Sequence, residues 1–140
     1  MSAVDELIAR INYLNIESDK RKIYNKLKTS IIFANTRGNP DIFLLSLTLG
    51  FKYNKRKKLK KSSNLFRVNE LGKDIWIPLS IGYKVLGDLS IFETKEGVVM
   101  ALKICEEYAN CGIDILNGMM KKPKEFTDDI IREIIKEDVL

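Results

Sequence analysis

The chain has 140 residues, 45% of them hydrophobic and 31% charged, a composition typical of one globular domain over residues 1–140. It contains no histidine, which excludes Ser-His-Asp and Cys-His catalytic arrangements and removes the commonest zinc ligand. No apolar run is long enough to cross a bilayer, so we expect a cytoplasmic protein without membrane contact.

The net charge of +5 is unevenly distributed. Residues 20–73 carry fifteen basic and two acidic residues, whereas the segments on either side carry more acidic than basic ones. This concentration of positive charge indicates either a surface for a polyanion or a surface that faces the acidic part of the same chain. An AT-rich genome would also raise the number of lysines, without selection for a partner.

Two helices are predicted in the first 30 residues. Apolar residues spaced three and four apart predict a helix over residues 2–14, with a serine at its N-terminus. Ser18 can begin a second, short and basic helix, in which Ile23, Tyr24 and Leu27 recur at helical spacing.

A central helix is predicted after the polar loop that ends at Asn39. Asn39 and Pro40 form a typical helix start, because asparagine caps a helix and proline is tolerated in its first turn. Residues 42–51 are apolar on nearly every side, which favours a buried helix, although a buried strand would give the same pattern. Residues 59–73 are interpreted as an extended connection.

Three more helices are predicted in the second half of the chain. The first begins near Asp74 and ends at Gly87, and its Trp76 is expected in the core. Thr94 caps the longest helix, over residues 95–117. Its Gly112 indicates a kink or a close contact with another helix.

The last helix is predicted over about residues 127–139. The expected fold class is therefore all-α, a compact single-domain bundle of about five to six helices with a basic loop.

The basic loop, residues 52–61, is the candidate nucleic-acid-binding site, and seven of its ten residues are lysine or arginine. Like charges so close together must be solvated or held against an anion, and we weigh a solvated loop and a polyanion-binding loop equally. Tyr53 and Phe66, at its two ends, are better explained as anchors into the core than as surfaces for base stacking. Lys20, Arg21 and Lys22 are expected to assist. The predicted binding residues are Lys52, Lys55, Arg56, Lys57, Lys58, Lys60, Lys61 and Arg67.

The alternative function is a protein–protein adaptor that docks through its C-terminal helices. The apolar side of the last helix must be covered by its own domain, by a partner or by a second copy, which would make a homo-oligomer. The face formed by residues 108–116 is a second docking candidate. The predicted partner interface consists of Ile130, Ile131, Ile134 and Ile135.

We do not expect an enzyme, a metal site or a cofactor. Glu106 and Glu107 are adjacent on a helix, so their carboxylates diverge by about 100°. Solvated surface charge explains the candidate carboxylates better than metal binding does. These carboxylates are Asp74, Asp88, Glu106, Glu107 and Asp114.

Two motifs within residues 40–117 are typical of a known family. The first is the turn Leu49-Gly50-Phe51-Lys52 after an apolar helix. The second is the run Glu106-Glu107-Tyr108-Ala109-Asn110, followed by Gly112, Ile115 and Leu116. With these motifs, residues 40–117 resemble the family called Dnd system-associated protein 4. The resemblance implies a small accessory protein of a prokaryotic DNA phosphorothioation and anti-phage defence system, with other defence-system proteins as partners. It brings no catalytic residues, and DNA, RNA and an acidic protein all stay open as ligands of the basic loop.

Overall fold

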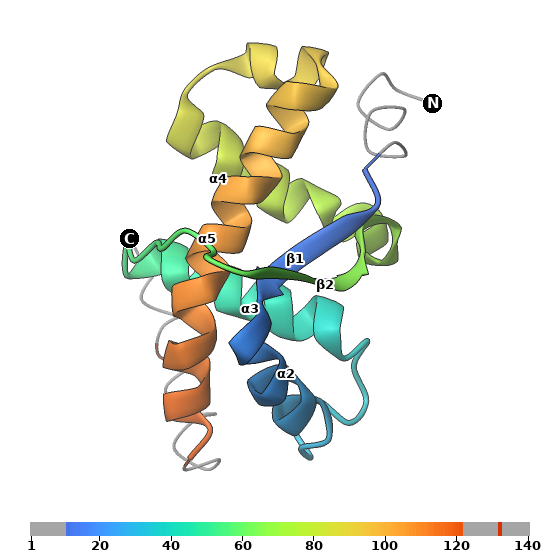
Figure 1. The fold of residues 1–140 in the computed structure, drawn as a ribbon, viewed down its shortest axis with the longest axis vertical. Coiled ribbons are helices and arrows are strands. Elements are labelled where there is room, and N and C mark those ends of the chain that lie inside the picture. The colour runs from blue at the N-terminus through green and yellow to red at the C-terminus, as the bar shows by residue number, and fades with distance from the viewer. Residues whose placement is uncertain (1–10, 122–131, 133–140) are drawn as a thin grey trace.

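The computed structural model describes residues 11–121 and Arg132. These residues are mostly helical, with four α-helices, three short 3-10 segments (η) and one two-stranded sheet (Figure 1). In the described part of the chain, no helix is long and apolar enough to cross a membrane. The elements in chain order are β1 (Tyr13–Glu17), η1 (Ser18–Lys20), α2 (Arg21–Lys28), α3 (Asn39–Lys52), β2 (Ser62–Arg67), η2 (Val68–Ile75), α4 (Trp76–Leu86), η3 (Leu89–Glu93) and α5 (Lys95–Met119).

The crossing of α3 and α5 forms the centre of the fold (Figure 1). Glycine makes this crossing close: a Cβ on Gly112 would lie 1.6 Å from the backbone oxygen of Ser46. A Cβ on Gly50 would lie 2.1 Å from the backbone oxygen of Tyr108. The expected close helix contact at Gly112 is therefore confirmed, and residues 42–51 form a buried helix, not a strand.

Two predicted helix boundaries, the start of α5 and the end of α4, are confirmed. The Thr94 hydroxyl accepts a hydrogen bond of 3.0 Å from the Gly97 N–H and caps α5. Gly87 ends α4 in the left-handed conformation that glycine adopts without strain. At the start of α3, Gly38 is the capping position and Asn39 lies inside the helix, so the predicted asparagine cap is wrong by one residue.

The two-stranded sheet corrects the all-α prediction. β1 and β2 pair antiparallel, and they replace the end of the helix predicted over residues 2–14 and part of the connection predicted over residues 59–73. Leu14 and Ile16 are both buried, and the period of two between them is that of a strand with one face on a core. The rest of the first predicted helix, residues 1–10, lies outside the described residues, as does the helix predicted over residues 127–139.

Three aromatic residues test the predicted core. Phe66 is buried, which confirms it as an anchor into the core, whereas Tyr53 is 43% exposed. The prediction that Trp76 belongs to the core is wrong, because its side chain is 46% exposed at the start of α4. Its ring packs edge-on against Phe92 of η3, 6.2 Å between centroids.

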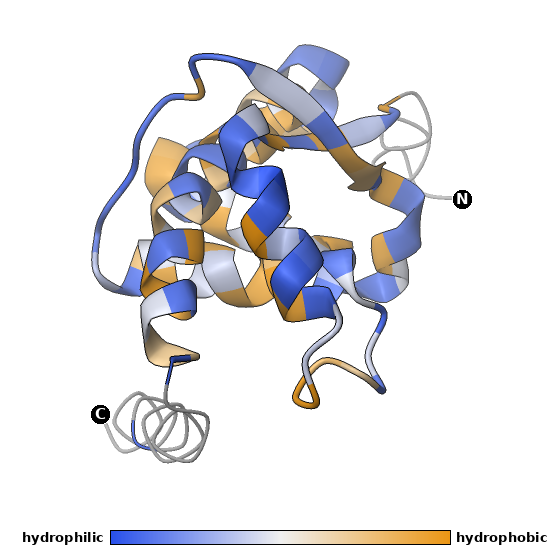
Figure 2. Ribbon diagram, turned by 60° about the horizontal axis from the view of Figure 1, so that its bottom comes forward, coloured by the Kyte–Doolittle hydropathy of each residue, from blue (hydrophilic) through white to orange (hydrophobic). Residues whose placement is uncertain are grey.

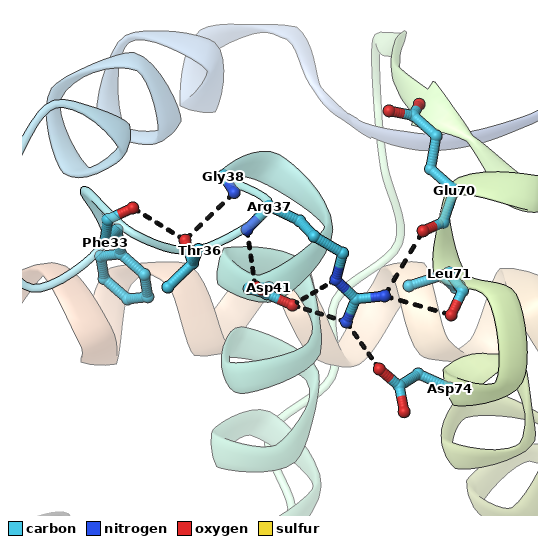
Figure 3. A network of polar contacts seen from close by, with 8 residues as sticks. All are labelled: Phe33, Thr36, Arg37, Gly38, Asp41, Glu70, Leu71 and Asp74. Atoms are coloured by element: carbon cyan, nitrogen blue, oxygen red, sulfur yellow. Dashed lines mark hydrogen bonds and ion pairs between the residues drawn. The ribbon is translucent and has the colours of Figure 1, made fainter.

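Arg37 connects the start of α3 to η2 through hydrogen bonds and ion pairs (Figure 3). Its Nε and Nη2 lie 2.9 and 2.6 Å from one carboxylate oxygen of Asp41. Nη2 also lies 2.6 Å from the carboxylate of Asp74, and Nη1 donates to the backbone oxygen of Leu71 at 3.1 Å. This guanidinium therefore binds groups of its own chain and is not part of the candidate nucleic-acid interface.

Candidate nucleic-acid interface

The basic segment, residues 52–61, leads from the end of α3 to the start of β2. Figure 2 shows it as a mostly hydrophilic trace along one edge of the molecule. Lys52 ends α3 and is half-buried, whereas the basic residues after it are exposed. Asn54, with a φ of 52°, turns the chain out of the helix. The segment then follows an extended, irregular path.

Both main-chain polar groups of Lys57, its N–H and its carbonyl, form hydrogen bonds with α5. Its N–H donates to the backbone oxygen of Glu107 at 3.2 Å. Its carbonyl accepts a hydrogen bond of 3.1 Å from the side-chain amide of Asn110. These contacts use no lysine side chain, so they position the segment and leave its charge at the surface.

Glu17, the last residue of β1, holds the other end of the segment. Its two carboxylate oxygens accept hydrogen bonds from the main-chain N–H groups of Lys60 and Lys61, at 2.9 and 2.6 Å. These two bonds, the Lys60 bond first, lower the pKa of Glu17, because they stabilise its charged form. The Ser18 N–H also donates to the Lys61 carbonyl at 2.8 Å.

Two basic side chains bind acidic residues of α5. Arg56 Nε lies 3.5 Å from a Glu107 carboxylate oxygen, and the Arg56 guanidinium lies over the Tyr108 ring, 5.6 Å from its centroid. Lys20, which was expected to assist DNA binding, has its Nζ 2.6 Å from the Asp114 carboxylate. Arg56 and Lys20 therefore follow the alternative in which basic residues face the acidic part of the same chain.

The other lysines of the segment, Lys52 apart, are available to an external anion. Within the described residues, no salt bridge involves their side chains. Three carboxylates, those of Glu17, Asp19 and Asp114, share a small hollow with two of them and offset part of their charge. Arg67, at the end of β2, is also exposed, with its guanidinium 5.4 Å from the Tyr13 ring centroid. The lysines are Lys55, Lys57, Lys58, Lys60 and Lys61.

A pocket of about 420 Å³ opens between β1, α5 and the basic segment. Glu106 lies on its wall, and its carboxylate accepts a hydrogen bond of 2.5 Å from the Asn15 N–H. Burial raises the pKa of Glu106 to about 7, although the Asn15 N–H acts in the opposite direction. The prediction that Glu106 and Glu107 are solvated surface charges is therefore wrong, because β1 and the basic segment cover this part of α5.

The two predicted docking surfaces have different outcomes. The four isoleucines of the predicted partner interface lie outside the described residues. The face over residues 108–116 is largely buried, since α5 packs it into the core, so it cannot receive a partner. Exposed apolar side chains occur instead on α4 and η3, where Trp76, Ile77 and Leu89 are 46%, 42% and 63% exposed.

Together these features define a small, mostly helical protein whose exposed basic segment is fixed against its longest helix. The chain belongs to the family of DNA sulphur modification system-associated protein 4, which matches residues 13–139. The match confirms the resemblance found in the sequence and extends beyond residues 40–117, where the quoted motifs lie. No curated protein and no solved structure matches the chain.

Proposed function

We propose that this protein is an accessory protein of a DNA sulphur modification system that binds DNA through its basic segment, in the cytoplasm and without catalysis of its own. Membership of the family supports the association with DNA modification. The observation that carries the DNA-binding part is the fixed path of the basic segment. Its main chain is hydrogen-bonded to Glu107, Asn110 and Glu17, while its lysine side chains lie exposed.

A fixed segment favours binding, because less of the main chain has to be ordered when the ligand arrives. The seven residues from Lys55 to Lys61 span at most about 25 Å when extended, and one strand of duplex DNA carries a phosphate for every ~3.4 Å of helix axis. Several phosphates are therefore within reach. If the five exposed lysines and Arg67 each neutralised one phosphate, log affinity would fall against log salt with a slope of about −5. Such contacts to the backbone carry no sequence information.

The test is a binding titration with short duplex and single-stranded DNA at several salt concentrations. Replacement of Lys55, Lys57 and Lys58 by serine should reduce the salt slope by about three units. The matched control replaces three exposed lysines elsewhere in the chain and should leave the slope nearly unchanged. Equal binding by the triple variant and the wild type would rule the proposal out. The control positions are Lys26, Lys73 and Lys95.

The triple variant tests charge and not folding, because the segment is attached by main-chain groups that serine retains. Circular dichroism should be unchanged. The same titration with phosphorothioate linkages addresses the link to sulphur modification. Tighter binding to phosphorothioate DNA than to unmodified DNA would support direct recognition of the modification. Equal binding would indicate that the protein binds DNA whether or not it is modified.

A second candidate function is an adaptor that docks on a larger protein of the same system. The exposed apolar residues of α4 and η3, and the family match over the terminal isoleucines, favour it. Deletion of residues 125–140, or replacement of Trp76 and Ile77 by serine, should weaken binding to purified proteins of the system. Sedimentation at high concentration would separate this function from self-association. Unchanged binding by both variants would count against the adaptor.

A further inference from the structure

The pocket of about 420 Å³ beside the basic segment has a size typical of small-ligand sites, which range over roughly 300–1,000 Å³. Its walls are largely apolar, with Leu59 from the basic segment and Val99 and Leu102 from α5. Tyr13 of β1 adds an aromatic ring that is 36% exposed. A flat, largely uncharged group would contact such walls well.

The polar group of the pocket is the carboxylate of Glu106. One of its oxygens is held at 2.5 Å by the Asn15 N–H, which fixes the orientation of the side chain. An ionised carboxylate can accept about four hydrogen bonds, so it has acceptor capacity left for a ligand. A second carboxylate, that of Glu107, also lines the pocket. An anionic group is therefore disfavoured inside, and a donor of hydrogen bonds is favoured.

The residues around the pocket carry positive charge, opposite to that of the Glu106 and Glu107 carboxylates inside it. Lys58 and Lys103 line the same pocket, and the rest of the basic segment continues from its edge. A cationic peptide would satisfy Glu106, but the lysines around the opening would repel it. A ligand that is anionic outside and presents a neutral, flat donor group inside satisfies both regions. A nucleotide within a strand has this distribution of charge.

We propose that the pocket binds an unpaired nucleobase with adjacent N–H donors, guanine above all, from a strand whose phosphates contact the basic segment. This inference rests on the proposed function. Guanine presents its N1–H and N2–H groups side by side, which matches the two oxygens of Glu106. Adenine presents an acceptor nitrogen at the corresponding edge, which the carboxylate repels. The base must be unpaired, because pairing occupies this edge. Tyr13 offers it a ring for stacking.

The test uses labelled single-stranded oligoadenosine DNA with one central guanine, hypoxanthine or adenine, at pH 8, where Glu106 is mostly ionised. Wild-type protein should bind the guanine strand roughly tenfold more tightly than the adenine strand, with hypoxanthine between them because it lacks the N2 group. Glu106→Gln should reduce the guanine preference to within about twofold and leave the salt slope unchanged. Glu93→Gln, a change of an exposed carboxylate outside the pocket, should retain the preference.

A second variant fills the pocket without removal of the carboxylate. Val99 is 40% exposed on the wall, so Val99→Trp should be tolerated by the fold and should also abolish the preference. Equal binding of all three strands by the wild type would overturn the inference, and so would a guanine preference that survives Glu106→Gln. Binding of every strand with a steep salt slope would leave the proposed function intact in that case. Failure to bind any of these strands would overturn the inference, and failure to bind duplex DNA as well would overturn the proposed function.

Discussion

Glu17 holds the main chain of Lys60, 43 residues further along the chain, through a hydrogen bond of 2.9 Å. The same carboxylate accepts a second bond from the Lys61 N–H. Glu17→Gln keeps the size of the side chain but leaves one acceptor oxygen and no charge. We expect faster amide hydrogen exchange at Lys60 and Lys61 and faster tryptic cleavage in the basic segment, with little change in global stability.

The pH dependence of this contact has a definite sign. The pKa of Glu17 is lowered in the folded protein, so the contact is complete above the unfolded-state pKa of about 4.5 and is lost as the pH falls through the folded-state value. Protection of the Lys60 amide, measured against its intrinsic exchange rate at each pH, should therefore fall in acid in the wild type. Glu93→Gln serves as the control. Identical exchange in the Glu17→Gln variant and the wild type at pH 7 would show that the carboxylate does not hold the segment.

Gly112→Ala should destabilise the protein by about 3 kcal/mol or more. The added Cβ would lie 1.6 Å from the Ser46 backbone oxygen, and a main-chain atom at the centre of the fold cannot move away cheaply. Gly118→Ala is a matched control on the same helix, since nothing lies within 4 Å of its added Cβ. That change should be neutral or stabilising by up to about 1 kcal/mol. Urea unfolding of both variants would measure the difference, and equal effects would contradict the packing explanation.

The helices were predictable because their signals are local. A threonine at the start of α5, a glycine at the end of α4 and a proline in the first turn of α3 act through neighbours in the sequence. Gly112 could also be interpreted, since a glycine inside a long apolar helix needs a reason. Trp76 was placed wrongly because the periodicity of a short apolar run does not define which side faces the core.

The remaining features depend on contacts between distant residues. β1 forms a strand because β2, about fifty residues later, supplies its hydrogen-bond partners. The alternation of Leu14 and Ile16 is the one local signal in the sequence that indicates this strand. The basic segment was located from its lysines, but its path depends on Glu17 and Asn110. The sequence predicts surface charge at Glu106, because no pattern in its own helix shows that another element covers it.

Arg37 should couple unequally to its two acidic partners. Asp41 accepts bonds from the Arg37 main-chain N–H, Nε and Nη2, whereas Asp74 accepts one from Nη2. We expect Arg37→Met to destabilise the protein by about 1–2 kcal/mol, since the network is partly exposed to solvent. Double-mutant cycles by urea unfolding should give the larger coupling energy with Asp41→Asn and the smaller with Asp74→Asn. The reverse order would show that the shared guanidinium depends mainly on Asp74.

Glu106 should make the protein less stable as the pH rises. Its pKa is about 7 in the folded protein, mainly because of burial, and about 4.5 in the unfolded chain. The folded state therefore retains the proton over this range, and stability is lost as the pH rises through about 7. The loss approaches about 3 kcal/mol well above pH 7. Glu17 and Asp88, with lowered pKa values, act in the opposite direction below about pH 4.5, so stability should be highest near pH 4.5 and should fall between there and pH 7.

Glu106→Gln isolates this effect, because glutamine resembles the protonated acid and can still accept the hydrogen bond of 2.5 Å from Asn15. At pH 8 the variant should be about 3 kcal/mol more stable than the wild type, and at pH 5 the difference should be below about 1 kcal/mol. Urea midpoints at the two pH values measure this, and Glu93→Gln should follow the wild type at both. Parallel pH profiles of the wild type and Glu106→Gln would mean that folding does not raise the pKa of the Glu106 carboxylate, and would contradict this prediction.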